Sequence, residues 1–82
     1  MSVDTQKAMA WLANVFAVQG RELTLDDTRS TVAEWDSMGD LLLLSMLEED
    51  LGIVVSADEV AAIGSTREIV ALLEKNNAFS SG

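Results

Sequence analysis

The sequence predicts an all-α fold: a small bundle with three longer helices, one short helix and a long loop between the first two. Apolar residues recur at spacings of three and four, which is the period of a helix with one buried face. Residues that commonly cap helices precede four of these segments. The chain has 82 residues, a length that gives one domain with a small core. We expect one domain over residues 1–82, with a helical core at about 4–76 and a disordered tail at 77–82.

The first helix is expected from about Asp4 to Val18. Asp4 suits the N-cap position, where its carboxylate can accept a hydrogen bond from a backbone N–H. Gly20 suits the stop after the last turn. One stripe at helical spacing is expected to face the core, and it consists of Met9, Leu12, Val15 and Phe16.

Residues 20–35 are expected to form a long loop. The stretch is rich in turn-forming and β-branched residues and shows no sustained helical period. Loops of this length are uncommon in small domains unless they are functional or packed on themselves. We expect Leu23, Leu25 and Val32 to anchor the loop and Trp35 to be a packing residue.

The second helix follows Asp36 and contains an apolar run, Leu41 to Leu47, which leads into the acidic cluster Glu48-Glu49-Asp50. At 100° per residue, its side chains separate onto two sides. The side expected to face the core carries Leu43, Leu44, Met46, Leu47 and Leu51. The other side carries Met38, Leu41, Leu42, Ser45, Glu48 and Glu49, with Ser37 at its N-terminal margin.

A domain this small has no second layer to cover the other side of this helix. Met38, Leu41 and Leu42 are therefore predicted to form an exposed apolar docking patch. Its burial against a partner would contribute about 25 cal/mol for each Å² removed from water. The competing interpretation is that the loop rearranges to cover these residues.

The last two helices are expected to begin at serines. Ser56 and Ser65 are each followed three residues later by a glutamate, a pattern in which the two side chains satisfy each other's backbone N–H groups. The first helix is short and ends at Gly64, and the second ends near Asn76. Residues 53–55 are expected to form a packed connector. The inward-facing residues are expected to be Val60, Ile63, Ile69, Val70, Leu72 and Leu73.

The charge of the chain points toward basic protein partners. Fourteen acidic and five basic residues give a net charge of −9, which disfavours nucleic acid and anionic membrane surfaces. No apolar stretch reaches the length of a membrane span, and the start lacks a basic segment followed by an apolar run. We expect a monomeric cytoplasmic protein that does not insert into membranes.

Cysteine and histidine are both absent. The chain therefore offers no disulfide, no zinc thiolate cluster and no thiol nucleophile. A serine nucleophile needs a neighbouring base, and neither histidine nor lysine stands near Ser37. A free-standing hydrolase that uses Ser37 is disfavoured for this reason. Nearly every Asp and Glu is expected to be solvated, which also disfavours a catalytic pair of carboxylates.

The segment Asp36-Ser37-Met38, at the mouth of the apolar helix and followed later by Leu51-Gly52-Ile53, resembles the modification site of the acyl carrier protein family. In that family the serine of an Asp-Ser-Leu or Asp-Ser-Met motif carries 4′-phosphopantetheine. The resemblance covers most of the chain and implies a four-helix bundle of the acyl-carrier type. It implies that Ser37 is the attachment point of a covalent arm from coenzyme A, and that Asp36 contacts the phosphopantetheinyl transferase or its metal.

The resemblance implies a carrier rather than an enzyme. Such a protein holds acyl intermediates as thioesters and delivers them to acyl-loading, condensing or acyl-transfer enzymes with basic docking patches, in fatty-acid, polyketide or related biosynthesis. In many members the acyl chain tucks between helices, and the Leu and Met content of residues 43–47 is compatible with an adaptable cavity. The residues expected to face partners are Met38, Asp40, Leu41, Leu42, Glu48 and Glu49.

Other interpretations stay open. Leu42 occupies a position that is often acidic in fatty-acid carriers, so the docking surface is more apolar here and a specialised carrier is plausible. An aminoacyl or peptidyl carrier fits the same motif. An unmodified acidic helical adaptor would use the same side of the helix for protein binding alone.

Overall fold

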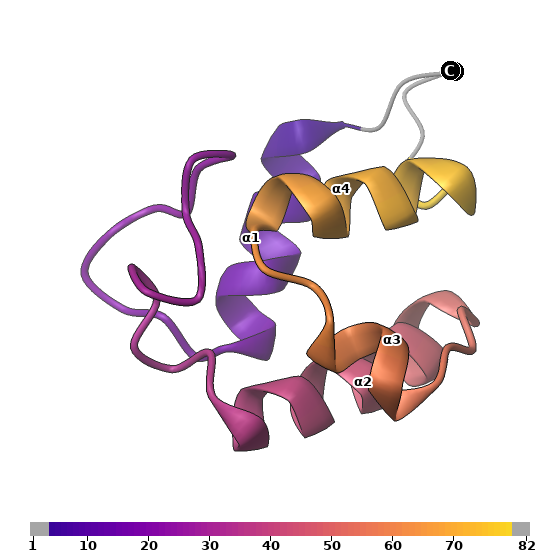
Figure 1. Ribbon diagram of the computed structural model, residues 1–82. Helices are drawn as coiled ribbons and strands as arrows, with labels where there is room; N and C mark the ends of the chain where they lie inside the picture. Colours follow the sequence, from indigo (N-terminus) through magenta and orange to yellow (C-terminus); the bar gives the residue numbers. More distant parts are fainter. Residues whose placement is uncertain (1–3, 80–82) are drawn as a thin grey trace.

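The structure is a computed structural model that describes residues 4–79 (Figure 1). Four helices occur in this part of the chain: α1 (Thr5–Val15), α2 (Ser37–Leu51), α3 (Ala57–Ala61) and α4 (Thr66–Lys75). The all-α prediction is confirmed, with a long loop between α1 and α2 and no strand in the described range. Helix α1 contacts both α2 and α4, and α3 packs on α2. None of these helices is long and apolar enough to cross a membrane.

The core lies where the apolar sides of the helices meet. The expected stripe of α1 is buried along its whole length, and on α2 the side chains of Leu43 and Leu47 are fully buried. Three other residues predicted to face the core, Leu44, Met46 and Leu51, are partly buried against it. The loop contributes Leu23 and Val32, as predicted, and Leu25 packs at the edge of the core.

Helix α1 ends at Val15, three residues before the predicted end, and Gly20 is not its stop. The chain leaves the helix at Ala17, which has a left-handed φ of 55°. The backbone N–H of Val18 donates to the carbonyl of Ala13 over 2.9 Å, which is the bond that closes a Schellman cap. The prediction was wrong because it placed the left-handed residue at a glycine, where this conformation costs least.

Ser56 and Ser65 cap α3 and α4 as predicted. Their hydroxyls accept hydrogen bonds from the backbone N–H groups of Glu59 and Glu68, at 3.1 and 3.3 Å. The return bonds differ from the expected ones at both helices, because Glu59 accepts from the hydroxyl of Ser56 over 3.3 Å and Glu68 accepts from the N–H of Gly64 over 2.6 Å. In the connector before α3, residues 53 and 55 pack inward, whereas Val54 is 77% exposed.

The tail predicted to be disordered spans residues 77–82, of which residues 77–79 make contacts with the helices and residues 80–82 lie outside the described part. Ala78 donates its backbone N–H to the carbonyl of Leu73 over 2.9 Å, and Asp4 donates to the carbonyl of Phe79 over 2.6 Å. The rings of Phe79 and Trp11 lie 5.9 Å apart. These contacts join the end of α4 to the start of α1.

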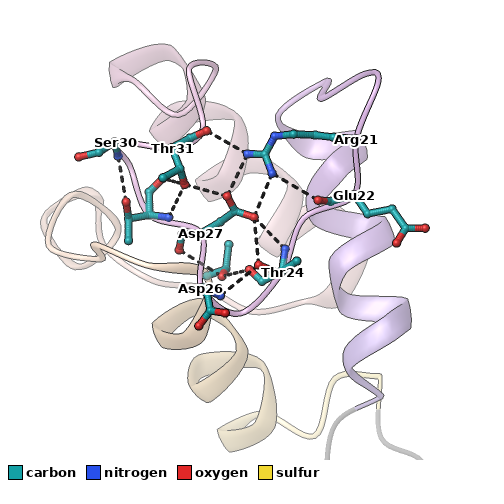
Figure 2. Close-up of polar contacts among 9 residues, drawn as sticks. Arg21, Glu22, Thr24, Asp26, Asp27, Ser30 and Thr31 are labelled. Atoms are coloured by element: carbon teal, nitrogen blue, oxygen red, sulfur yellow. Dashed lines mark hydrogen bonds and ion pairs between the residues drawn. The ribbon is translucent and has the colours of Figure 1, made fainter.

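The long loop is organised around a buried carboxylate, that of Asp27, which is 6% exposed (Figure 2). Arg21 donates two hydrogen bonds to it, at 2.9 and 3.2 Å. The backbone N–H of Thr24 and the hydroxyl of Thr31 add bonds of 2.8 and 2.7 Å. These donors, the Arg21 guanidinium foremost, hold the pKa of Asp27 far below its ordinary value despite the opposing effect of burial. The expectation of a solvated carboxylate was therefore wrong here.

The loop is also tied to α4. The backbone N–H of Thr66 donates to the carbonyl of Asp27 over 3.0 Å, and Thr28 forms an isolated antiparallel bridge with Ser65. The hydroxyl of Thr66 donates to the carbonyl of Thr24 over 2.5 Å. This buried threonine thus joins the loop to the first turn of α4, and the loop leads into α2 from a fixed position.

Candidate functional site

Ser37 is the first residue of α2, and its side chain is exposed. Asp36 precedes it in an extended conformation and caps the helix, since its carboxylate accepts the backbone N–H of Gly39 over 3.0 Å. The predicted capping role of Asp36 is confirmed. Within residues 4–79, the N–H groups of Ser37 and Met38 have no hydrogen-bond acceptor. The start of α2 therefore offers two free donors beside the exposed hydroxyl.

Gly39 allows the turn that precedes Ser37 to pack closely against α2. A Cβ at this position would lie 2.5 Å from the carbonyl oxygen of Glu34 and 3.3 Å from the ring of Phe16. Any side chain here would push the preceding turn away from the helix. The absent side chain of Gly39 thus helps to place Ser37, a role for which the sequence carries no local signal.

Trp35 is a packing residue, as predicted. It is 3% exposed, and its ring stacks on that of Phe16 with a centroid distance of 5.2 Å. Arg29 lies over the indole with its guanidinium carbon 5.0 Å from the ring centroid. The indole N–H donates to the carboxylate of Asp40 over 3.1 Å. The turn that leads to Ser37 is therefore anchored in the core.

Asp40 differs from the other residues predicted to face partners, because its carboxylate is used inside the protein. Arg29 pairs with it at 2.8 Å and donates a second bond of 3.1 Å. The same guanidinium reaches the end of α3, where it donates to the carbonyls of Val60, Ala61 and Ile63 at 3.0, 3.1 and 2.6 Å. Asp40 therefore links α2 to Arg29 and α3, and these contacts argue against a docking role for it.

The predicted apolar patch is exposed. Met38, Leu41 and Leu42 are 64%, 56% and 43% exposed, so the loop does not fold over this side of α2. The patch begins one residue after Ser37, and the exposed, polar Ser45 follows it further along the helix. Ser37 therefore stands at the edge of an apolar surface.

The acidic residues of α2 are divided between its two ends. Glu48 and Glu49 are exposed at the far end, eleven and twelve residues after Ser37. At about 1.5 Å per residue, Glu48 lies roughly 16 Å along the helix axis from Ser37. The neighbouring Asp50 accepts a hydrogen bond from the indole of Trp11 over 2.9 Å. The exposed acids Glu48 and Glu49 thus lie at the opposite end of α2 from Ser37.

The site has the parts of an acceptor and lacks those of a self-activating nucleophile. The Ser37 hydroxyl has no hydrogen-bond partner within residues 4–79, and the chain contains no histidine or cysteine. The described residues hold no group of three side chains suited to bind a metal ion. An exposed hydroxyl with two free N–H donors beside it fits a phosphodiester, because helix starts favour the negative charge of phosphate.

Two hollows lie away from Ser37. One of about 580 Å³ opens between α1 and the loop, with Met9, Ala13 and Leu23 in its wall. Another of about 320 Å³ opens between α3 and α4, lined by residues that include Val60 and Leu72. Neither is lined by residues 43–47, the segment expected to border a cavity for an acyl chain.

Comparison with known protein families and with curated protein sequences finds no match to this chain.

Proposed function

We propose that this protein is an acyl carrier in which Ser37 bears 4′-phosphopantetheine. The observation that carries the proposal is the combination at the start of α2 of a free, exposed serine hydroxyl, an aspartate cap and an exposed apolar patch. An unpartnered hydroxyl on a helix end is accessible to another enzyme. The patch beside it gives that enzyme a surface to bind.

Each residue at the start of α2 has a role in this function. The Oγ of Ser37 would form a bond to the phosphorus next to the pantetheine of coenzyme A, while the pyrophosphate P–O bond of coenzyme A breaks and adenosine 3′,5′-bisphosphate leaves. The serine hydroxyl would lose its proton to a base of the transferase, because this chain contains no histidine. The N–H groups of Ser37 and Met38 would favour the phosphate charge. Asp36 holds the first turn while its second carboxylate oxygen stays available to the transferase or its metal. When bound, the arm supplies the thiol for thioester formation, and the chain itself encodes none.

The proposal covers carriers of fatty-acyl, polyketide and aminoacyl or peptidyl cargo alike, since all three would be held on the same arm. Met38, Leu41 and Leu42 would contact the partner enzymes. Glu48 and Glu49 would meet basic groups on those enzymes at the far end of α2.

The test is the intact mass of the folded protein after incubation with coenzyme A and a broad-specificity phosphopantetheinyl transferase. We expect the wild-type chain to gain the mass of one arm and Ser37→Ala to gain none. Ser45→Ala is the matched control, because Ser45 is an exposed serine on the same side of α2, and we expect it to be modified like the wild type. A folded wild-type chain that stays unmodified would contradict the proposal.

The second candidate function is that of an unmodified acidic adaptor. The exposed patch and the acidic end of α2 favour it, because protein binding through them needs no modified serine. An adaptor would gain no mass in this measurement, and its Ser37→Ala variant would bind the partner as well as the wild type does.

A further inference from the structure

The two ends of α2 present different chemistry to a partner. Within residues 37–46, Asp40 is the single acidic residue, and its carboxylate is held by Arg29 and Trp35. The side chains exposed beside Ser37 are those of Met38 and Leu41, together with Leu42. Within α2, the surface that follows Ser37 is therefore apolar, and the exposed acid beside Ser37 is Asp36, which precedes the helix.

The exposed acidic residues of α2 lie far from Ser37. Glu48 lies roughly 16 Å from Ser37 along the helix axis. Charges in physiological salt are screened over about 8 Å, which is half that distance. An enzyme seated on Ser37 thus experiences little of the field of Glu48 and Glu49.

A second copy of this chain does not fit the apolar patch. Each copy carries a net charge of −9, so two copies repel one another. Three side chains that are each about half exposed also supply far less than the roughly 800 Å² per partner that a stable interface buries. The patch suits a brief contact with an enzyme that must reach the serine.

We propose that enzymes acting at Ser37 bind through an apolar hollow that receives Met38, Leu41 and Leu42, and that Arg29 sets this preference by holding Asp40 inside the protein. This inference rests on the proposed function, since it concerns enzymes that act on Ser37 or its arm. Basic patches on such enzymes would meet only the far end of α2. Arg29 acts as a positioning residue, because it touches Asp40 and α3 rather than the partner.

The test is the rate of Ser37 modification by the broad-specificity transferase, measured as kcat/KM at low and at high salt. We expect Leu41→Ser combined with Leu42→Ser to lower kcat/KM about tenfold, because the variant loses apolar area that the contact would bury. Glu48→Gln combined with Glu49→Gln should lower it by about twofold or less, since screened surface charges contribute little. The wild-type rate should change little between the two salt concentrations.

Val54→Ser is the matched control for the loss of an exposed apolar side chain. Val54 is 77% exposed, but it lies beyond the C-terminal end of α2 and far from Ser37. We expect this variant to be modified at the wild-type rate. Circular dichroism shows whether each variant is folded.

Two further variants test the role of Arg29. Arg29→Gln frees the carboxylate of Asp40, and we expect its modification rate to become salt-dependent while the final adduct stays the same. Asp40→Asn removes the charge in question without exposing it, so its rate should stay salt-independent. If Arg29→Gln does not fold, Asp40→Asn still tests the inference. If the carboxylate of Asp40 bound the enzyme directly, removing its charge would change the modification rate severalfold.

The outcomes separate this inference from the proposed function. Absence of any adduct on the folded wild-type chain would overturn the proposed function and the inference with it. An adduct whose rate of formation follows salt, Glu48 and Glu49 rather than Leu41 and Leu42 would overturn the inference alone.

Discussion

Asp27 is the residue on which the order of the long loop depends most, through its carboxylate. Its two oxygens accept bonds from Arg21, Thr24 and Thr31, while the carbonyl of the same residue accepts from Thr66 (Figure 2). The side chain of Asp27 thereby joins both ends of an eleven-residue stretch, Arg21 to Thr31, and its backbone attaches that stretch to α4. A charge held this way stabilises the fold only while it is ionised.

Asp27→Asn is expected to lower the free energy of unfolding by about 1 to 3 kcal/mol at neutral pH, the usual range for hydrogen bonds to a charged group. The pKa of Asp27 in the folded protein lies below its ordinary value of 3.8. Its contribution is therefore fully present above that ordinary value and is lost as the pH falls toward the folded-state pKa. Urea unfolding from pH 7 to pH 3 should show the difference between the wild type and the variant beginning to narrow once the pH falls below about 4.

Asp26→Asn is the control for this measurement. The neighbouring Asp26 is exposed, and its pair with Arg67 at 3.5 Å lies on the surface. Such a pair contributes about 1 kcal/mol or less. Equal losses in the free energy of unfolding from the two substitutions would show that the buried hydrogen bonds of Asp27 do not stabilise the loop.

Gly39→Ala tests the close approach of the chain before Ser37. Alanine is favoured over glycine inside a helix by about 1 kcal/mol, but its Cβ would lie 2.5 Å from the carbonyl oxygen of Glu34. Crowding of this kind costs about 1 to 3 kcal/mol, so we expect a net loss of stability in thermal unfolding and slower modification of Ser37. Ser45→Ala, at an exposed position of α2, is the control. A more stable Gly39→Ala protein would contradict the close approach.

The starts of the helices could be read from the sequence, whereas the end of α1 could not. Asp4, Asp36, Ser56 and Ser65 all cap the helices they precede, because an N-cap bond spans only three residues and its pattern is local. The end of α1 depends instead on Ala17 adopting a left-handed conformation that favours glycine. Nothing in the local sequence indicates this choice.

Ala17→Gly is expected to stabilise the protein by about 0.5 to 1 kcal/mol, because glycine adopts the left-handed conformation without steric cost. Ala10→Gly provides the opposite control: it is exposed inside α1, and glycine there should cost about 1 kcal/mol. Denaturant unfolding of both variants tests whether they change the free energy of unfolding in opposite directions. Destabilisation by both would show that Ala17 is not the left-handed residue that ends α1.

Part of the candidate site could likewise be predicted from the local sequence, whereas another part depends on contacts between residues far apart in the chain. The helical period alone predicted that Met38, Leu41 and Leu42 are exposed, because it assigns α2 a core-facing side and leaves the other uncovered. The pairing of Asp40 with Arg29 could not be predicted, because the two residues are eleven positions apart and meet only once the loop has folded. The contacts of Arg29 with the end of α3 join residues more than thirty positions apart.

The whole molecule combines a firmly held interior with one uncovered helix side. The ends of the described chain meet through Asp4 and Phe79, the loop is attached to α4, and Arg29 connects the loop with α2 and α3. Figure 1 shows how the helices and the loop are arranged. These ties leave the start of α2 in a defined position while its outer side remains open. A net charge of −9 makes copies of the chain repel one another.

Mapping of the modified residue tests the central claim most directly. The folded chain would be incubated with coenzyme A and the transferase, digested, and examined by tandem mass spectrometry for the position of the added arm. We predict one arm per chain, on the peptide that contains Ser37, with Ser30 and Ser45 bare although both are exposed. A folded chain without any arm, or with arms distributed over these other serines, would contradict the account.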